Sequence, residues 1–516
     1  MTTVHTHCGT LNGNLENGIY SYKGIPYAES LAGAALWSPP TPRKRWSGLR
    51  DARSYGPACM QFSSSGFKWP LPSVRTQYFR ALGSIKTIVE GDDSLLLNVW
   101  TPSIDKTAKL PVMVWLHGGG FTNGSADERY DAAPFASRGV VCVTIQYRLG
   151  PPGFLHGSGL FDGELCADNR AFEDQLCALR WVQENIASFG GDPSCITLFG
   201  QSAGAFAIYQ LMASPKAKGL FQRAIAMGGM AETCAPAKEY HQLTRDALQD
   251  VGVTAGNNQA LISLSREEIT KLQAAVSKRI FRNKNPEQYG SLSRNRIAFV
   301  GAATGTAFLP SPPLESYRKG AHGPIDLMLG TCANDGNLFS MALPLGRTLS
   351  SKIFSGNLTG LVPKRDMNAV RKYYAQQLPG AAKTYIIEKI NNDAFYRMPT
   401  VRAAEAHALA YPGRTWHYQL DYKSALPRIG AIHAIDVALL FRTEQLRALL
   451  RNDEDTSRLS STLRDALVSF AKTGKPSAPR MPAWAPYEKK TRTTMIFDDE
   501  CRVVSDFEGH LRRYWK

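Results

Sequence analysis

From residue 96 onward, short apolar runs alternate with longer stretches that have helical periodicity. Continuous apolar runs are typical of strands buried on both faces, as in parallel sheets. The pattern predicts strands at 96–100, 112–117, 140–146, 195–199, 223–227, 326–330 and 415–420, with helices at 174–188 and 203–213. Strands that alternate with helices predict the α/β class, with a mostly parallel central sheet and helices on both faces.

Two long stretches, 231–320 and 340–412, are polar, rich in helical patterns and hard to place on the sheet. We interpret them as large helical insertions within a single domain, 1–516, that cover the carboxyl edge of the sheet. Ligands bind at that edge in open parallel sheets. We therefore expect these insertions to cover the substrate pocket, with its rim formed by 60–93, 275–300 and 340–360.

The composition is that of an ordinary globular protein, with 43% apolar and 20% charged residues. The net charge is +16, and the densest basic band runs from Lys271 to Arg296. We favour a solvated helix face for this band over a surface that attracts anions. The sequence has no nucleic-acid-binding signature, and no apolar run approaches the roughly 18 residues of a membrane span.

The N-terminus lacks a basic segment followed by an apolar stretch, so no signal peptide is visible. Nine cysteines are too few for a disulfide scaffold, and the number is odd. His5, His7 and Cys8 lie close together, but no second cluster has the spacing of zinc ligands. We expect a cytoplasmic, reduced protein without a metal, and the sequence indicates no oligomeric state.

The strongest chemical signal is the segment GQSAG at residues 200–204, between a predicted strand and a predicted helix. This strand–turn–helix context is typical of a nucleophile elbow, in which Ser202 sits on a sharp, strained turn. Glycines at both flanks avoid collisions with neighbouring backbone. The alternative is a glycine-rich turn with a capping serine.

A second signal, HGGGF at 117–121, follows the predicted strand 112–117 directly. Three glycines let backbone N–H groups approach an acyl oxygen, as in the oxyanion hole of esterases and lipases. We expect the donors to be Gly119, Gly120 and Ala203, each worth about 10² to 10³ in rate. Neither glycine cluster precedes the Lys-Ser or Lys-Thr of a phosphate-binding loop.

Several further segments occur in the same order as in a known family: GDDSLLLNVWTP, VMVWLHGGGF, IQYRLGPPGF, EDQLCALRWVQENIASFGGDPSCITLFGQSAG, SPKAKGLFQRAIAMGG, LMLGTCANDGNLF and GAIHAIDVALLF. Together they make the chain resemble the type-B carboxylesterase family, which includes the cholinesterases. The resemblance covers nearly the whole chain. It implies an α/β-hydrolase fold and the hydrolysis of carboxylic esters.

A serine hydroxyl needs a base to take its proton. His433 lies late in the chain, as the order serine–acid–histidine of this fold requires, and it also matches the family's catalytic histidine motif. His117 belongs to the expected oxyanion loop, where we expect it to order backbone. His417 alternates within a predicted strand, which indicates a packed residue.

The acid that orients the histidine is expected at Asp335, which follows a predicted strand and matches the family position. The family often carries Glu there, and a triad works with either residue. Asp436, three residues after the histidine, is the second candidate. We interpret it as a buried supporting carboxylate.

The chain departs from the family pattern at several positions. Gln201 stands where most members carry Glu, which implies weaker attraction for cationic substrates and less stabilisation of an imidazolium. Ser94 replaces a cysteine that in secreted members pairs with the one matching Cys59, so that disulfide cannot form. The cholinesterases stack the choline cation on a tryptophan in this loop, and Trp69 lies too early for that role. The resemblance therefore does not extend to the cholinesterases.

We therefore predict a serine hydrolase that cleaves small-molecule carboxylic esters through an acyl-enzyme, with Ser202, Asp335 and His433 as its triad and no cofactor. Gln201 and Phe121 are expected to contact the substrate. The alternatives are acyl transfer by the same triad and a non-catalytic binding protein of the same fold.

Overall fold

The structure is a computed structural model that describes residues 2–62, 74–82, 88–282, 285–294, 301–338 and 367–515. The predicted rim segment 340–360 lies outside the described residues, as do Trp69 and parts of 60–93 and 275–300.

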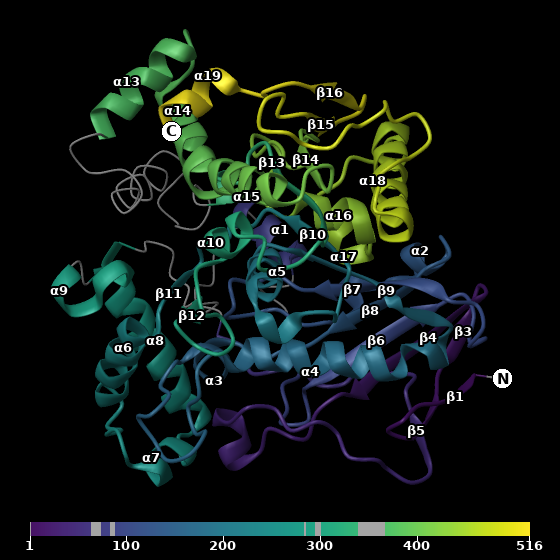
Figure 1. Ribbon diagram of the computed structural model, residues 1–516, viewed down its shortest axis with the longest axis vertical. Coiled ribbons are helices and arrows are strands. Elements are labelled where there is room, and N and C mark those ends of the chain that lie inside the picture. The colour runs from purple at the N-terminus through teal and green to yellow at the C-terminus, as the bar shows by residue number, and fades with distance from the viewer. Residues whose placement is uncertain are drawn as a thin grey trace.

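A mixed sheet of eleven strands forms the centre of the molecule (Figure 1). In spatial order its strands are β16 (Arg502–Val504), β15 (Thr494–Phe497), β14 (Thr415–Leu420), β13 (Asp326–Cys332), β10 (Arg223–Met227), β9 (Gly191–Gln201), β7 (Leu110–Leu116), β8 (Val141–Ile145), β6 (Leu96–Thr101), β4 (Ile19–Pro26) and β3 (Asn14–Glu16). The strands from β15 to β8 run parallel. The remaining pairs, at the two edges, are antiparallel. Every predicted strand is present and the sheet is mostly parallel, as predicted, although β6 pairs antiparallel with β8.

Two small sheets flank the centre, one of β1 (Thr3–His5), β2 (Thr10–Asn12) and β5 (Leu49–Asp51), the other of β11 (Cys234–Pro236) and β12 (Ala302–Thr304). The α-helices of the described residues are α1 (Val74–Ala81), α2 (Ala133–Ala136), α3 (Gly150–Phe154), α4 (Arg170–Asn185), α5 (Ala203–Ala213), α6 (Ala237–Gln249), α7 (Asn258–Ile262), α8 (Arg266–Arg282), α9 (Pro286–Tyr289), α10 (Pro313–Arg318), α13 (Met367–Gln377), α14 (Lys383–Asn392), α15 (Met398–Ala410), α16 (Ile435–Phe441), α17 (Glu444–Arg447), α18 (Glu454–Thr473) and α19 (Gly509–Arg512). The predicted helix 203–213 coincides with α5, and the helix predicted at 174–188 corresponds to α4 and the short turn that follows it.

The sheet is buried on both faces, as the apolar strand pattern predicts. Along β7, Val112 and Val114 face a core formed with α4, α5 and α15, whereas Met113 and Trp115 face a second core formed with α2, α16 and α18. All four side chains are fully buried. Since successive strand residues point to opposite faces, this alternation explains why the strand carries no polar residue.

The stretch 231–320 supplies α6 to α10 and the sheet β11–β12, and Figure 1 shows α6, α7, α8 and α9 grouped at one side of the central sheet. The described part of 340–412 supplies α13, α14 and α15. Of these, α15 packs against β13 and β14. This helix therefore belongs to the layer that covers one face of the sheet.

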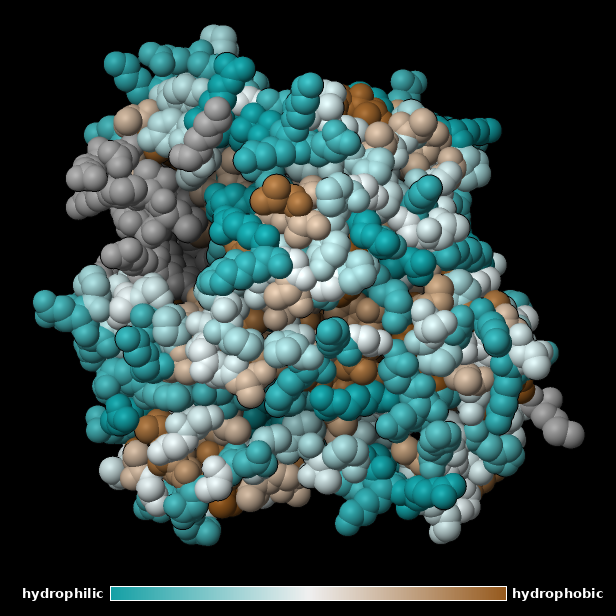
Figure 2. Space-filling view, in the orientation of Figure 1, coloured by the Kyte–Doolittle hydropathy of each residue, from teal (hydrophilic) through white to brown (hydrophobic). Residues whose placement is uncertain are grey.

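The ion pairs of α8 fit the interpretation of the basic band from Lys271 to Arg296 as a solvated helix face. On α8, Lys271 pairs with Glu267 at 2.9 Å and Arg279 pairs with Asp250 at 2.7 Å, so acidic neighbours offset both charges. Figure 2 shows hydrophilic residues across most of the visible face, with small separate apolar areas between them. Within the described residues, no helix is both long enough and apolar enough to cross a membrane.

Candidate active site

Ser202 lies on a strained turn between β9 and α5, with φ 56° and ψ −121°. Its N–H donates to the carbonyl of Met227 at 2.9 Å, which ties the turn to β10. A Cβ atom on Gly200 would lie 2.8 Å from the carbonyl oxygen of Leu116, and one on Gly204 would lie 2.0 Å from the same oxygen. Larger residues would therefore collide with backbone, so the structure confirms the expected reason for both glycines.

The glycine loop that follows β7 packs directly against this turn. A Cβ on Gly118 would lie 3.2 Å from the Cβ of Ser202. Gly119 and Gly120 have φ values of 122° and 62°, which favour glycine. The structure thus places the loop of the expected oxyanion donors beside Ser202, while Ala203 begins α5, whose N-terminal N–H groups favour negative charge.

His117 orders this loop, as predicted. Its carbonyl accepts a 2.6 Å hydrogen bond from the Tyr147 hydroxyl, and the two rings stack at 4.4 Å. Burial lowers the pKa of His117 to about 4, so the imidazole is neutral at neutral pH. A buried ring with these contacts supports the backbone of the loop.

His433 and Asp335, the expected base and acid, are in direct contact. Nδ1 of His433 lies 2.7 Å from Oδ1 of Asp335, and both side chains are buried. The other carboxylate oxygen accepts a 2.7 Å hydrogen bond from the N–H of Cys332. Because the carboxylate accepts at Nδ1, that nitrogen carries the proton and the lone pair of the neutral ring is at Nε2.

Backbone contacts fix the two loops that carry this pair. The N–H of Asn334 donates to the carbonyl of Ala431 at 3.0 Å, and the N–H of Ala431 donates to Oδ1 of Asn334 at 3.0 Å. The hydroxyl of Tyr78, on α1, donates to the carbonyl of His433 at 2.7 Å. The loops after β13 and β14 are therefore held together independently of the Ser202 turn.

The side chain of Gln201 contacts the ring of His433. Its Nε2 lies 3.2 Å from Nε2 of His433 and 3.5 Å from Nδ1. Within the described residues, the Ser202 hydroxyl makes no hydrogen bond to His433. Catalytic hydrogen bonds are often long before substrate binds. The amide of Gln201 is therefore the polar neighbour of the His433 ring in this structure.

Asp436 is 1% exposed and is close enough to Asp335 and His433 for their charges to act on it. Burial, and then the charge of Asp335, raises the pKa of Asp436 to about 7. One of its oxygens accepts a 2.8 Å hydrogen bond from the N–H of Val437. Asp335, and not Asp436, contacts His433 Nδ1, and the buried position predicted for Asp436 is confirmed.

Phe121, the residue after the three glycines, is buried among other aromatic rings. Its ring is 2% exposed and stacks on Phe154 at 4.4 Å, with Phe206 of α5 at 6.1 Å. The contact that the sequence predicts between Phe121 and substrate can therefore involve only the face of the ring that lines a narrow pocket.

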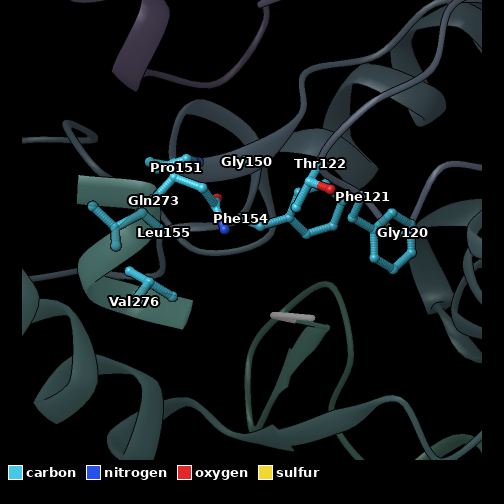
Figure 3. A pocket seen from close by; sticks show the side chains of 9 residues that line it. All are labelled: Gly120, Phe121, Thr122, Gly150, Pro151, Phe154, Leu155, Gln273 and Val276. Atoms are coloured by element: carbon cyan, nitrogen blue, oxygen red, sulfur yellow. The ribbon is translucent and has the colours of Figure 1, made fainter. Parts of the chain in front are cut away.

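That pocket begins at the oxyanion loop and is narrow, because the space inside it is about 10 Å³, close to what one water molecule needs. Apolar atoms dominate its walls, which are formed by Gly120, Phe121, Thr122, Gly150, Pro151, Phe154, Leu155, Gln273 and Val276. In Figure 3, Gln273 and Val276 project from α8 on one side, and Gly120 and Phe121 lie on the other.

Sequence reasoning missed several residues of the site. Gly228 follows β10, and a Cβ on it would lie 3.4 Å from both Oδ1 of Asp335 and Cε1 of His433. Gly228 and Gly229 directly follow an apolar strand, as the glycines of the expected oxyanion loop do. This pattern in the sequence could have indicated that the segment lies at the site. Tyr78 and Tyr396, whose ring lies 5.0 Å from the ring of His433, carry no comparable local signal.

The described residues contain no group of three or more His, Cys, Asp or Glu side chains that could hold a metal ion. All nine cysteines are free. The thiol of Cys59 lies 3.7 Å from the carbonyl oxygen of Ser94, so the two positions are neighbours, as the resemblance implied.

Comparisons with known proteins show which proteins the chain is similar to. The model of the carboxylesterase family matches residues 1–515. The para-nitrobenzyl esterase of Bacillus subtilis is 34% identical over 99% of this chain and 97% of its own length, and the phenmedipham hydrolase of Pseudarthrobacter oxydans is 30% identical over 97% and 96%. Among solved structures, a PNB esterase has a TM-score of 0.80 at 32% identity, and the carboxylesterase EST55 of Geobacillus stearothermophilus has 0.82 at 30%; each match covers both chains fully.

Proposed function

Because the chain belongs to the carboxylesterase family and has the α/β-hydrolase fold, we propose that it cleaves carboxylic esters through an acyl-enzyme formed on Ser202. It is a carboxylic ester hydrolase, as its relatives are. The proposal concerns the residues and the steps by which it acts. Its main support is the 2.7 Å contact between His433 and Asp335 beside a serine on a strained elbow.

In the first half of the reaction, His433 Nε2 takes the proton of Ser202 as the hydroxyl attacks the ester carbonyl. For this transfer the ring exchanges its contact with Gln201 for one with Ser202. Asp335 accepts from Nδ1 throughout and stabilises the imidazolium. The N–H groups of Gly119, Gly120 and Ala203 stabilise the oxyanion.

The tetrahedral intermediate then collapses, and His433 donates its proton to the departing alcohol. This leaves an acyl group on Ser202. Water enters, gives a proton to His433 as it attacks the acyl carbon, and releases the carboxylic acid with the serine restored. No step uses a metal or an organic cofactor.

The pocket beside the oxyanion loop supports a preference for uncharged esters with an apolar group. Its walls are almost wholly apolar, and α8, from the 231–320 stretch, supplies one of them. This contribution supports the proposal that the stretch shapes the substrate pocket. The name of the Bacillus subtilis relative makes para-nitrobenzyl esters suitable first substrates. A panel of p-nitrophenyl esters of increasing acyl length measures the depth of the pocket.

The test is to trap the acyl-enzyme. Acid-quenched protein should gain the mass of one acyl group on the peptide that carries Ser202, and Ser202→Ala should lose both the adduct and about 10⁶ of kcat. Ser214→Ala is a matched control, because Ser214 is a buried serine just beyond the far end of α5. It should keep adduct and turnover. Ordinary turnover by Ser202→Ala would refute the assignment of the nucleophile.

The same experiment separates hydrolysis from acyl transfer. With an added alcohol as a competing nucleophile, a hydrolase yields mainly the free acid. A new ester as the main product would instead identify a transferase.

A further inference from the structure

A single turn of π-helix, Asp393–Arg397, joins α14 to α15. The N–H of Met398 donates to the carbonyl of Asp393, five residues earlier, which is the hydrogen bond of a π turn. Pro399 follows directly and has no N–H to donate to the carbonyl four residues earlier, which disfavours an unbroken α-helix at this point. Single π turns within α-helices occur frequently at functional sites.

The ring of Tyr396, in this turn, packs against the imidazole of His433. The two ring centroids are 5.0 Å apart, and the ring planes are inclined by 43°. Each of the two residues is 4% exposed, so the contact is almost closed to water. Burial raises the pKa of the Tyr396 phenol well above its usual value. Tyr396 therefore meets the imidazole as an uncharged ring.

The other contacts of His433 act at single atoms of its ring. Asp335 accepts from Nδ1 at 2.7 Å, and the amide of Gln201 lies 3.2 Å from Nε2. Among the described residues, Tyr396 supplies the one aromatic ring in contact with the imidazole. A hydrogen bond at Nδ1 holds one atom, whereas a packed ring restricts rotation about the bonds that carry the imidazole. Tyr396 therefore limits the orientations that the base can adopt.

A buried ion pair holds the π turn in place. Asp393 is fully buried and accepts hydrogen bonds from Nε and Nη2 of Arg397, both at 2.7 Å, and from the hydroxyl of Tyr374 at 2.5 Å. Glu508, beside α19, lies 3.4 Å from Nε of Arg397. Because Tyr396 directly precedes Arg397, a fixed direction for the arginine side chain also fixes the direction in which the tyrosine ring points.

We propose that Tyr396 is a positioning residue for His433. Its ring confines the imidazole to orientations in which Nδ1 stays on Asp335 while Nε2 can reach Ser202, and the locked π turn holds the ring there. This role rests on the proposed function, because it affects turnover only if His433 takes the proton of Ser202. Tyr396 does not line the substrate pocket, so loss of its ring should lower kcat and leave KM nearly unchanged.

The test compares Tyr396→Leu with Tyr396→Phe on a p-nitrophenyl ester. The leucine variant loses the ring, and kcat should fall about three- to tenfold, the range for one aromatic pair. The phenylalanine variant keeps the ring and should stay within about twofold of the wild-type kcat. Tyr396→Met is a second ring-free variant, and the thermal unfolding midpoint checks that each variant is folded at the assay temperature.

Tyr240→Leu is the matched control. Tyr240 is a buried tyrosine of α6 whose ring lies 4.6 Å from the ring of His156 at an inclination of 48°, a similar pair that involves none of the proposed catalytic residues. Its loss should lower the unfolding midpoint as the loss of Tyr396 does, but leave kcat unchanged. A fall in kcat as large as that of Tyr396→Leu would show that lost stability alone explains the effect.

The rate at which a fluorophosphonate labels Ser202 is a second measurement, independent of product release, and it should fall by the same factor as kcat in both ring-free variants. His433→Ala separates the two levels of the argument. If it keeps ordinary turnover, the proposed function fails. If it loses turnover while Tyr396→Leu keeps the wild-type kcat and labelling rate, the proposed function stands and the role of Tyr396 is overturned. An equal loss in Tyr396→Phe would also overturn that role, because the hydroxyl and not the ring would then matter.

Discussion

Replacing Gln201 with glutamate introduces a carboxylate beside the proposed general base without changing the number of non-hydrogen side-chain atoms. The amide nitrogen of Gln201 lies 3.2 and 3.5 Å from the two ring nitrogens of His433. The uncharged amide places no negative charge beside the ring. A carboxylate at the same place favours the imidazolium instead.

The size of the effect follows from the distance and the burial. A single opposite charge within about 4–6 Å shifts the titration of a group by about 1 to 3 pH units. Gln201 is 3% exposed, so burial opposes ionisation of the new carboxylate, and Asp335 on the other side of the ring adds like-charge repulsion. Both effects reduce the shift, and we expect about 1 to 2 units. Since the base must be unprotonated to accept the serine proton, the acid limb of kcat/KM moves to higher pH.

The assay is the pH profile of kcat/KM from about pH 5 to about pH 9 with an uncharged p-nitrophenyl ester. Gln201→Leu is the control, because it removes the amide without adding a charge and should move the acid limb by less than Gln201→Glu. A cationic ester should also gain in kcat/KM relative to its neutral isostere in the glutamate variant. An acid limb that stays within about 0.3 units of the wild type in Gln201→Glu would refute this account of the residue.

Three further substitutions test the surroundings of the site. Burial raises the pKa of Asp436 to about 7, against about 3.9 in an unfolded chain, so stability should fall as pH rises from about 4 to about 7. Asp436→Asn should remove that fall and gain up to roughly 4 kcal/mol at pH 8 in urea unfolding; a pH-independent difference would contradict this. Ser94→Cys should pair with Cys59 under oxidising conditions and add about 3 to 4 kcal/mol, read as a reductant-sensitive unfolding midpoint, and an unchanged thiol count would disprove it. Tyr78→Phe leaves the carbonyl of His433 without its donor and should cost about 1 to 3 kcal/mol of stability and lower kcat more than it changes KM; unchanged unfolding and kcat would argue against the role of this contact.

The parts of the fold that the sequence predicts are those with local causes. Strands buried on both faces leave continuous apolar runs, and β10 and β14 begin and end at the predicted residues. The Ser202 turn needs glycines at 200 and 204 because the carbonyl of Leu116 lies within 3 Å of both positions. Such requirements act on neighbouring residues, so they remain visible in the sequence.

The remaining features depend on contacts between distant residues. The hydroxyl of Tyr78 meets the carbonyl of His433 across 355 positions, and nothing in the sequence around either residue indicates the pairing. The antiparallel direction of β6 is likewise set by the chain path and not by composition, because a strand buried on both faces has the same apolar pattern in either direction. The contact of Gln201 with His433 has a local and a distant cause. The GQSAG motif fixes the position of Gln201 in the turn, whereas the fold brings His433 into contact with its side chain.

The hydrogen bonds around the site indicate which of its parts are held in place and which can move. Asp335 and His433 sit on loops that are joined by the two hydrogen bonds between Asn334 and Ala431, so the acid and the base form one unit. Ser202 is tied instead to β10. The exchange that we propose for His433, from Gln201 to Ser202, would therefore be a movement of the ring within a fixed frame. Residues that touch the ring should alter the pH profile, whereas residues that join the loops should mainly alter stability.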